Sequence, residues 1–205
     1  MALATAAVVL VASMIAARAP LSTVEVTLFR AVNDLPEAIH PFVWPLMQYG
    51  TFITIPTLCL VALLVRRTRL ALAMALAGVG VYLIAKIVKI AVERPRPAGL
   101  LDHVQLRESF AAGSLGFPSG HAAVAAALAF TCAVYLGGWW FRASLTLAVA
   151  VVVGRLYVGA HLPLDVVGGA ALGVISASAV VLALGTGRRG SAASRHQDRA
   201  RPAAP

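Results

Sequence analysis

The chain has 205 residues, of which 60% are hydrophobic and only 12% are charged, and its mean hydropathy is +0.86. A soluble domain carries about 25% charged residues, so this composition excludes an ordinary soluble protein and indicates a single domain in a lipid bilayer. The formal net charge is +9, but the cations fall at the ends of apolar segments and in the C-terminal tail. This distribution fits membrane topology and anionic headgroups, and it argues against nucleic acid as a partner.

Six apolar segments are long enough, or nearly so, to cross a bilayer, which takes about 20 residues. They cover residues 2–17, 50–65, 70–92, 122–136, 140–158 and 164–184. The sequence therefore predicts an all-α integral membrane bundle of about six transmembrane helices, formed by one membrane domain over residues 1–184. Residues 185–205 are polar and are expected to form a disordered cytoplasmic tail.

The first apolar segment and the region after it allow specific predictions. The stretch Ala17–Pro20 resembles a signal-peptide cleavage site, but no basic region precedes the apolar run and a proline directly follows the cut, so a retained span is favoured. Residues 24–32 place apolar side chains on one helical face, and three prolines follow. This pattern predicts an interfacial helix and then a loop, with Trp44 and Tyr49 at headgroup level.

The basic residues predict an orientation. With the N-terminus inside, nine of the 17 Lys and Arg residues are cytoplasmic, namely Arg66, Arg67, Arg69, Arg142 and five arginines of the tail. The positive-inside rule then favours both termini in the cytoplasm. Three clusters of polar residues, each at the end of an apolar segment, come to lie together on the extracytoplasmic face.

The first cluster is Lys89, followed after six residues by Arg96 and Pro97. Membrane proteins keep charges beside lipid only where they face a site, and a point charge next to a planar fork suits a tetrahedral oxyanion. The alternative is a pair of cations that snorkel at the end of a span. Arg94 also precedes a proline, but it lacks the six-residue spacing from Lys89, so it is expected to have no role in the cluster.

The second cluster is Pro118-Ser119-Gly120-His121. Ser119 is a plausible N-cap, Gly120 lets backbone come close to a ligand, and free N–H groups at a helix start bind anions. His121 would stand over that site as a proton donor. The alternative is a helix cap with an incidental histidine. A serine hydrolase is a weak alternative because no G-x-S-x-G turn is present.

The third cluster contains Arg155, His161 and Asp165. His161 and Asp165 are four residues apart, so they share a face if a helix begins near them. A carboxylate on one imidazole nitrogen fixes the tautomer and directs the other nitrogen as a nucleophile, whereas a purely structural His–Asp bond is the alternative. Two histidines with fixed cations suit phosphoryl transfer without a metal.

The three clusters resemble the three-part signature of the type-2 phosphatidic-acid phosphatase superfamily over residues 89–165. Its members include integral-membrane lipid phosphatases, glucose-6-phosphatase and vanadium haloperoxidases. The third motif usually opens with Ser-Arg but reads Gly154-Arg155 here, so no side-chain ligand is expected at residue 154.

The resemblance implies metal-independent hydrolysis in two steps. His161 would attack phosphorus to form a phosphohistidine, oriented by Asp165, and His121 would protonate the leaving group and later activate water. The phosphoryl oxygens would be held by Lys89, Arg96, Ser119, Gly120 and Arg155.

No cofactor or metal is expected, since no Cys/His cluster has zinc spacing and no carboxylate run indicates calcium. Cys59 and Cys132 lie in apolar runs and are expected to be packing residues rather than a disulfide.

We therefore expect a multi-pass lipid phosphatase of a bacterial inner membrane, with its active site facing outward. Its partners would be the bilayer and a lipid phosphate, for which polyprenyl pyrophosphate, phosphatidic acid and phosphatidylglycerol phosphate all fit; the sequence leaves the oligomeric state open. A phosphotransferase that passes the phosphoryl group to another lipid is the main alternative. A transporter is less favoured because no internal repeat is visible, and a haloperoxidase because the chain is a membrane protein.

Overall fold

The computed structural model describes residues 1–110 and 113–186, in which every regular element is a helix apart from one isolated bridge between Pro95 and Leu115. The all-α prediction is confirmed for this part of the chain, while the predicted tail from residue 187 onward lies outside it. The helices are α1 (Ala2–Arg18), α2 (Thr23–Asn33), α3 (His40–Met47), α4 (Thr54–Leu64), α5 (Thr68–Val92), α6 (Gly120–Tyr135), α7 (Gly138–Tyr157) and α8 (Pro163–Leu184), with 3-10 turns at Glu37–Ile39, Gln48–Gly50 and Pro97–Gly99.

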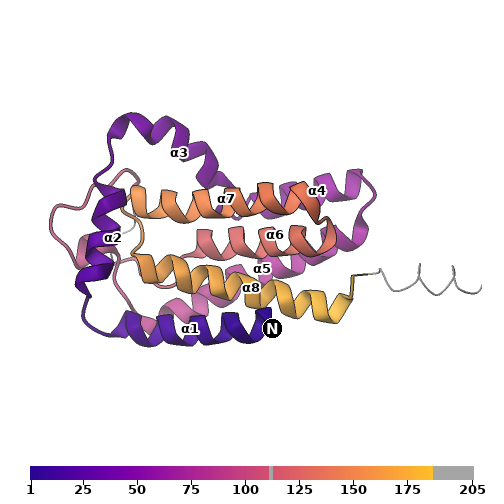
Figure 1. Ribbon diagram of the computed structural model, residues 1–205, viewed down its shortest axis with the longest axis horizontal. Helices are drawn as coiled ribbons and strands as arrows, with labels where there is room; N and C mark the ends of the chain where they lie inside the picture. The colour runs from indigo at the N-terminus through magenta and orange to yellow at the C-terminus, as the bar shows by residue number, and fades with distance from the viewer. Residues whose placement is uncertain (111–112, 187–205) are drawn as a thin grey trace, which may run out of the picture.

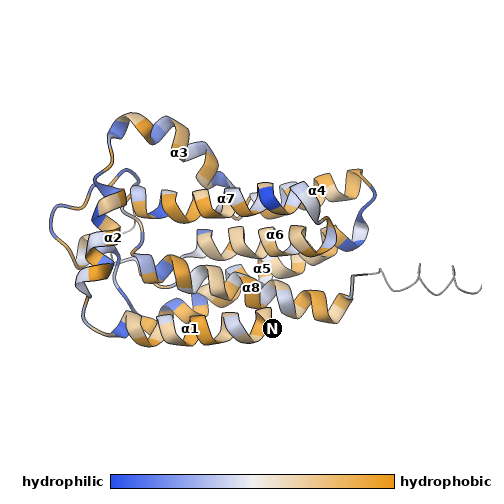
Figure 2. Cartoon of the chain, viewed as in Figure 1, coloured by the Kyte–Doolittle hydropathy of each residue, from blue (hydrophilic) through white to orange (hydrophobic). Residues whose placement is uncertain are grey.

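Helix α6 lies at the centre of the bundle and contacts α5, α7 and α8, while α1 packs on α8 and α4 packs on α5. These helices run along the long axis of the molecule, and α2 lies across one end (Figure 1). Apolar residues dominate the helices, and polar residues gather in the connections at the two ends (Figure 2). This distribution is the one expected of a bundle whose sides face lipid.

Small residues allow α6 and α8 to approach each other closely. A Cβ atom on Gly169 of α8 would overlap the carbonyl oxygen of Ser119, and one on Gly173 would overlap that of Ala123. Helices in membranes pack through such small residues because close backbone contact replaces the hydrophobic driving force. The first turn of α6 and the first turns of α8 are thereby held together.

Among residues 1–110 and 113–186, three helices, α5, α7 and α8, are long and apolar enough to cross a membrane, so the chain is a multi-pass membrane protein. The number rises to five if two bent pairs each count as one span: α1 with α2, bent by 97°, and residues 37–50 with α4, bent by 69°. Helix α6 is apolar but has only 16 residues. A count of six spans and an interfacial position for α2 therefore stay predictions.

The loop predicted after α2 is wrong, because this region contains α3. Pro41 lies in the first turn of α3, where its missing N–H leaves no hydrogen bond unmade, and Pro45 is tolerated inside this eight-residue helix. Met47 at the end of α3 is almost fully buried against α7. Tyr49 packs against buried residues of α6 and α7, whereas the Trp44 side chain is half exposed.

Candidate active site

The three clusters converge at one end of the bundle, where α5 and α7 end and α6 and α8 begin (Figure 1). Backbone hydrogen bonds join their loops: the Gly116 N–H donates to the Arg94 carbonyl over 2.7 Å, and the Ser119 N–H donates to the Asp165 carbonyl over 2.8 Å. A Cβ on Gly116 would lie 2.9 Å from both Asp165 Oδ2 and the Pro95 carbonyl. The loops are therefore packed too tightly for any side chain at residue 116.

Lys89 and Arg96 of the first cluster both reach across to other loops. The Lys89 Nζ donates to the carbonyl oxygens of Leu115 and Gly116 at 2.9 and 3.0 Å. The Arg96 Nε donates to Ser114 Oγ at 2.7 Å, and its Nη1 donates to the Ala160 carbonyl at 2.8 Å. These contacts argue against two cations that merely snorkel at the end of a span.

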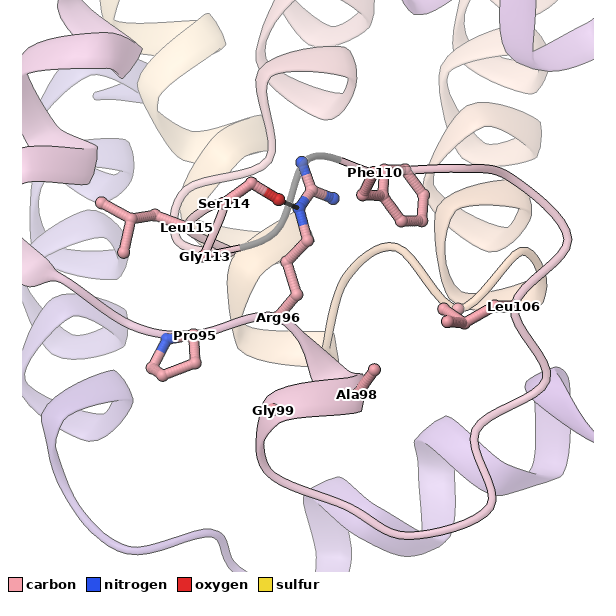
Figure 3. A pocket seen from close by; sticks show the side chains of 10 residues that line it. Pro95, Arg96, Ala98, Gly99, Leu106, Phe110, Gly113, Ser114 and Leu115 are labelled. Atoms are coloured by element: carbon pink, nitrogen blue, oxygen red, sulfur yellow. Dashed lines mark hydrogen bonds between the residues drawn. The ribbon is translucent and has the colours of Figure 1, made fainter.

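A cavity of about 410 Å³ lies beside Arg96. The Arg96 guanidinium extends between Ser114 and the ring of Phe110 (Figure 3), and its Cζ lies 4.3 Å from the ring centroid. The centroid of the same ring lies 5.7 Å from Arg155 Cζ. Phe110 therefore links arginines of the first and third clusters beside a space large enough for a small polar group.

The second cluster forms the start of α6. Ser119 is fully buried and caps the helix through its Oγ, which accepts from the Ala122 N–H at 3.4 Å, so the predicted N-cap is confirmed. Apart from Gly120's own neighbours, no atom of the described residues lies within 4 Å of a Cβ placed on Gly120, so the backbone there is open to a ligand. His121 follows in the first turn, with its carbonyl 2.6 Å from a Cβ placed on Gly50. The structure thus combines an open helix N-terminus with an imidazole, as an anion site requires.

The third cluster is deeply buried. Arg155 is 3% exposed, and its Nη1 donates to Glu108 Oε2 at 2.7 Å. His161 is 2% exposed, and its pKa lies well below the usual value because the ring is buried and the charges of Arg155, Lys89 and Arg96 oppose its protonation. The His161 imidazole is therefore neutral at neutral pH, as a nucleophile must be.

Asp165 lies directly beside His161, as their four-residue spacing predicts. The His161 Nδ1 is 3.5 Å from Asp165 Oδ2, but the two form no hydrogen bond, and this buried nitrogen has no other hydrogen-bond partner among the described residues. The same oxygen accepts from the Leu162 N–H at 2.9 Å, because Asp165 occupies the third position of α8 and caps that helix. Capping fixes the carboxylate in place, with one face turned to the imidazole.

Arg94, for which no role in the first cluster was expected, contacts a residue of the third cluster instead. Arg94 is 5% exposed, and its Nη1 donates to Asp165 Oδ1 at 2.9 Å. Its two terminal nitrogens also bind both oxygens of Glu25 on α2, at 3.0 and 2.7 Å. Glu25 shares a buried face of α2 with Phe29 and Asn33, at intervals of four residues. A charge on a buried helical face needs a partner, and that spacing was the signal available in the sequence.

Two further residues beside Arg155, Glu108 and Phe110, could not be predicted from sequence spacing. They lie in the irregular segment between α5 and α6, where no periodic pattern places side chains relative to the clusters. In the structure these two residues bring a carboxylate and a ring to Arg155.

Taken together, the clusters place three cations around two imidazoles. The positive charges of Arg155, Arg96 and Lys89 lie close enough to His121 and His161 to interact electrostatically with both rings. Within residues 1–110 and 113–186, no group of three or more His, Cys, Asp or Glu side chains could hold a metal ion. The arrangement can bind an anion and move a proton.

Comparison with known proteins identifies the family. The sequence model of the PAP2 superfamily matches residues 66–189. An undecaprenyl-diphosphatase from Sulfolobus acidocaldarius is 27% identical over 150 residues, which cover 72% of this chain and 72% of that protein.

Two crystal structures share the fold. LpxE from Aquifex aeolicus matches with a TM-score of 0.67 and 22% identity, over 78% of this chain and 96% of that one. The first transmembrane PAP2-type phosphatidylglycerolphosphate phosphatase from Bacillus subtilis matches with a TM-score of 0.71 and 22% identity, over 90% and 98%. Because the family model spans more than half of the sequence and includes all three clusters, the chain belongs to the PAP2 superfamily and is a membrane phosphatase of that superfamily.

Proposed function

We propose that this phosphatase hydrolyses a phosphomonoester or pyrophosphate of a membrane lipid through a phosphohistidine intermediate. The observation that carries this proposal is the position of His161: a buried, neutral imidazole beside the Asp165 carboxylate and among three cations. The cations compensate the phosphoryl charge, and the imidazole supplies a lone pair.

In the first step His161 Nε2 attacks phosphorus while Nδ1–H faces Asp165. A P–N bond forms, the bond from phosphorus to the leaving oxygen breaks, and His121 donates a proton to that oxygen. The non-bridging oxygens are held by Lys89, Arg96, Arg155, Ser119 and Gly120. The fixed charges need no rearrangement as the transition state forms, which is the main benefit of a preorganised site.

In the second step His121, now neutral, takes a proton from water. The resulting hydroxide oxygen attacks phosphorus, the P–N bond breaks, and inorganic phosphate leaves. His161 returns to its neutral form, so the two steps regenerate the enzyme without any added group.

The substrate is proposed to be a lipid because the site lies at one end of apolar helices, where headgroups lie in a bilayer. We place the site on the extracytoplasmic face of a bacterial inner membrane, supported by the arginines at the opposite end of α5. Polyprenyl pyrophosphate, phosphatidic acid and phosphatidylglycerol phosphate remain candidates. The undecaprenyl-diphosphatase relative favours the first of these.

The test is phosphate release by the purified chain from these three lipids in detergent with excess chelator. At least one lipid should be hydrolysed, and labelled phosphate should be trapped on the protein during turnover. His161→Ala should abolish both signals, since loss of a nucleophile costs several orders of magnitude in kcat. His103→Asn is the matched control, because His103 is exposed and has φ of 54°, which Asn tolerates. Near-normal hydrolysis by His161→Ala would refute the mechanism.

A further inference from the structure

We propose that Arg94 and Glu25 act as a positioning pair for Asp165: Arg94 favours the ionised carboxylate, and Glu25 holds Arg94 and the start of α8 so that this carboxylate stays aimed at His161. The inference rests on the function proposed above, and it gives α2, which carries none of the three clusters, a part in the reaction. Neither residue touches the phosphate in this scheme. Both act through Asp165.

The first support is the connectivity of the buried charges. Arg94 Nη1 is shared between Asp165 Oδ1 at 2.9 Å and Glu25 Oε1 at 3.0 Å, while Nη2 binds Glu25 Oε2 at 2.7 Å. Glu25 Oε1 also accepts from the Leu164 N–H at 3.1 Å, next to Asp165 at the start of α8. Glu25 therefore holds both the arginine and the helix end that carries the carboxylate.

The second support is burial. Arg94 and Glu25 are each 5% exposed, and Asp165 is fully buried. Buried ion pairs contribute little net stability, because desolvation of the charges offsets their attraction. Buried charges that bring little stability are often retained at functional sites, and here the network ends on the residue that orients the His161 imidazole.

The two partners act on Asp165 with opposite sign. The charge of Arg94, together with that of Lys89 from α5, favours the ionised carboxylate, which can accept the His161 Nδ1–H. The charge of Glu25 offsets part of that effect, so that Asp165 keeps enough negative potential to stabilise the positive charge that develops on the imidazole during attack. Removing either partner should therefore slow the reaction, but the two removals should shift the acid limb of the pH profile in opposite directions.

The sign of each shift follows from which form of Asp165 is active. The ionised form is needed, so activity is lost as pH falls through the acid limb of the kcat/KM profile, which reports free enzyme. Without the Arg94 charge, protonation of Asp165 becomes easier and the acid limb moves to higher pH. Without the Glu25 charge, protonation becomes harder and the limb moves to lower pH.

The experiment compares wild type with Arg94→Met, Arg94→Lys and Glu25→Gln on the lipid that the wild type hydrolyses. Arg94→Met should lower kcat by about tenfold to a hundredfold with little change in KM, the cost typical of losing a group that orients a reacting side chain. Arg94→Lys should restore part of kcat and part of the acid limb, because it restores the charge without the two-pronged geometry.

The matched control is Arg107→Met. The Arg107 side chain is also buried, at 6% exposed, and it pairs with Glu37 and donates to the backbone carbonyls of Asn33, Leu35 and Tyr157. It meets the third cluster at the backbone between Arg155 and His161 rather than at Asp165, so its loss should lower the thermal midpoint in detergent without moving the acid limb.

Opposite shifts in Arg94→Met and Glu25→Gln support the inference. If the acid limbs do not move, or if both move in the same direction, the pair is merely structural and the inference is overturned. If Arg94→Met fails to fold, the inference is tested by the acid limbs of the Arg94→Lys and Glu25→Gln profiles. The proposed function fails separately: it falls if the wild type releases no phosphate or if His161→Ala stays active, whereas unmoved limbs with an inactive His161→Ala overturn only the positioning pair.

Discussion

Arg155 already has an anionic partner in the free protein. The Glu108 carboxylate lies 2.7 Å from its Nη1, and the Glu108 side chain is 25% exposed while that of Arg155 is 3% exposed. The carboxylate can thus swing away into solvent while the arginine stays fixed. Because the carboxylate keeps access to solvent, an incoming phosphate can take its place beside the arginine.

Replacement of Glu108 by Gln should therefore strengthen anion binding. The variant keeps the size of the side chain but removes the charge that competes for Arg155, so the inhibition constants of vanadate and inorganic phosphate should fall by about twofold to fivefold. Inhibition of lipid hydrolysis measures both. Glu37→Gln is the control, since Glu37 is an exposed partner of Arg107. Weaker inhibition in Glu108→Gln would show that the carboxylate orients Arg155 rather than competing with substrate.

Sequence spacing brought together the residues of the three clusters because each cluster is local, set by one loop and the helix beside it. The contacts of Arg94 were missed because its buried partner Glu25 is 69 residues away in the sequence. An arginine near the end of a span looks the same in sequence whether it faces headgroups or a buried carboxylate. Only the position of α2 across the end of the bundle decides between the two.

Among the helices, α3 explains the departure of the third cluster from the family motif. A Cβ atom on Gly154 would overlap the Cγ of Met47 and lie 2.8 Å from its Sδ. The space that a serine side chain would fill at residue 154 is therefore occupied by the end of α3. The glycine follows from helix packing, and the structure gives residue 154 no side chain to offer a phosphate.

Gly154→Ser should accordingly destabilise the protein by about 1–3 kcal/mol, the usual cost of overpacking a buried contact. The thermal midpoint in detergent should fall, and Met47→Ala should recover part of the loss in the double variant. Gly80→Ser on α5 is the control, because the nearest atom to a Cβ there is 3.5 Å away. An unchanged midpoint together with higher phosphatase activity would instead mean that a hydroxyl at residue 154 can join the site.

The long helices were predictable because hydropathy alone marks their extent: α5, α7 and α8 begin and end within two residues of the predicted segments. Helix α3 was not predictable in this way, since two of its eight residues are prolines, which usually indicate a loop. Helix α6 begins at the Ser119 cap and ends just before Gly137 and Gly138, which both have positive φ, so it is shorter than a span.

At the scale of the whole molecule, the clusters and the arginines at residues 66–69 lie at opposite ends of α5. This helix has 25 residues and is therefore roughly 38 Å long, more than the hydrocarbon thickness of a bilayer. The two ends should thus face opposite sides of the membrane.

Cysteine labelling in intact cells tests this orientation. Leu100→Cys should react with an impermeant reagent added outside, and Thr68→Cys should not, with Cys59 and Cys132 replaced by Ala in both variants. Leu100 and Thr68 are both exposed, so access of the reagent to a cysteine there depends only on the side of the membrane. Labelling of residue 68 from outside would place the active site in the cytoplasm.

The hydrogen bond from the Ser119 N–H to the Asp165 carbonyl has a consequence for biosynthesis. A chain is made from its N-terminus, so α6 is complete before α8 has left the ribosome. Until then the first turn of α6 lacks its backbone partner, and α1 lacks the helix on which it packs. Arrival of α8 supplies both contacts together with Asp165. A nascent chain that has not yet made α8 therefore lacks the carboxylate beside His161, so the site proposed here can form only after α8 has emerged.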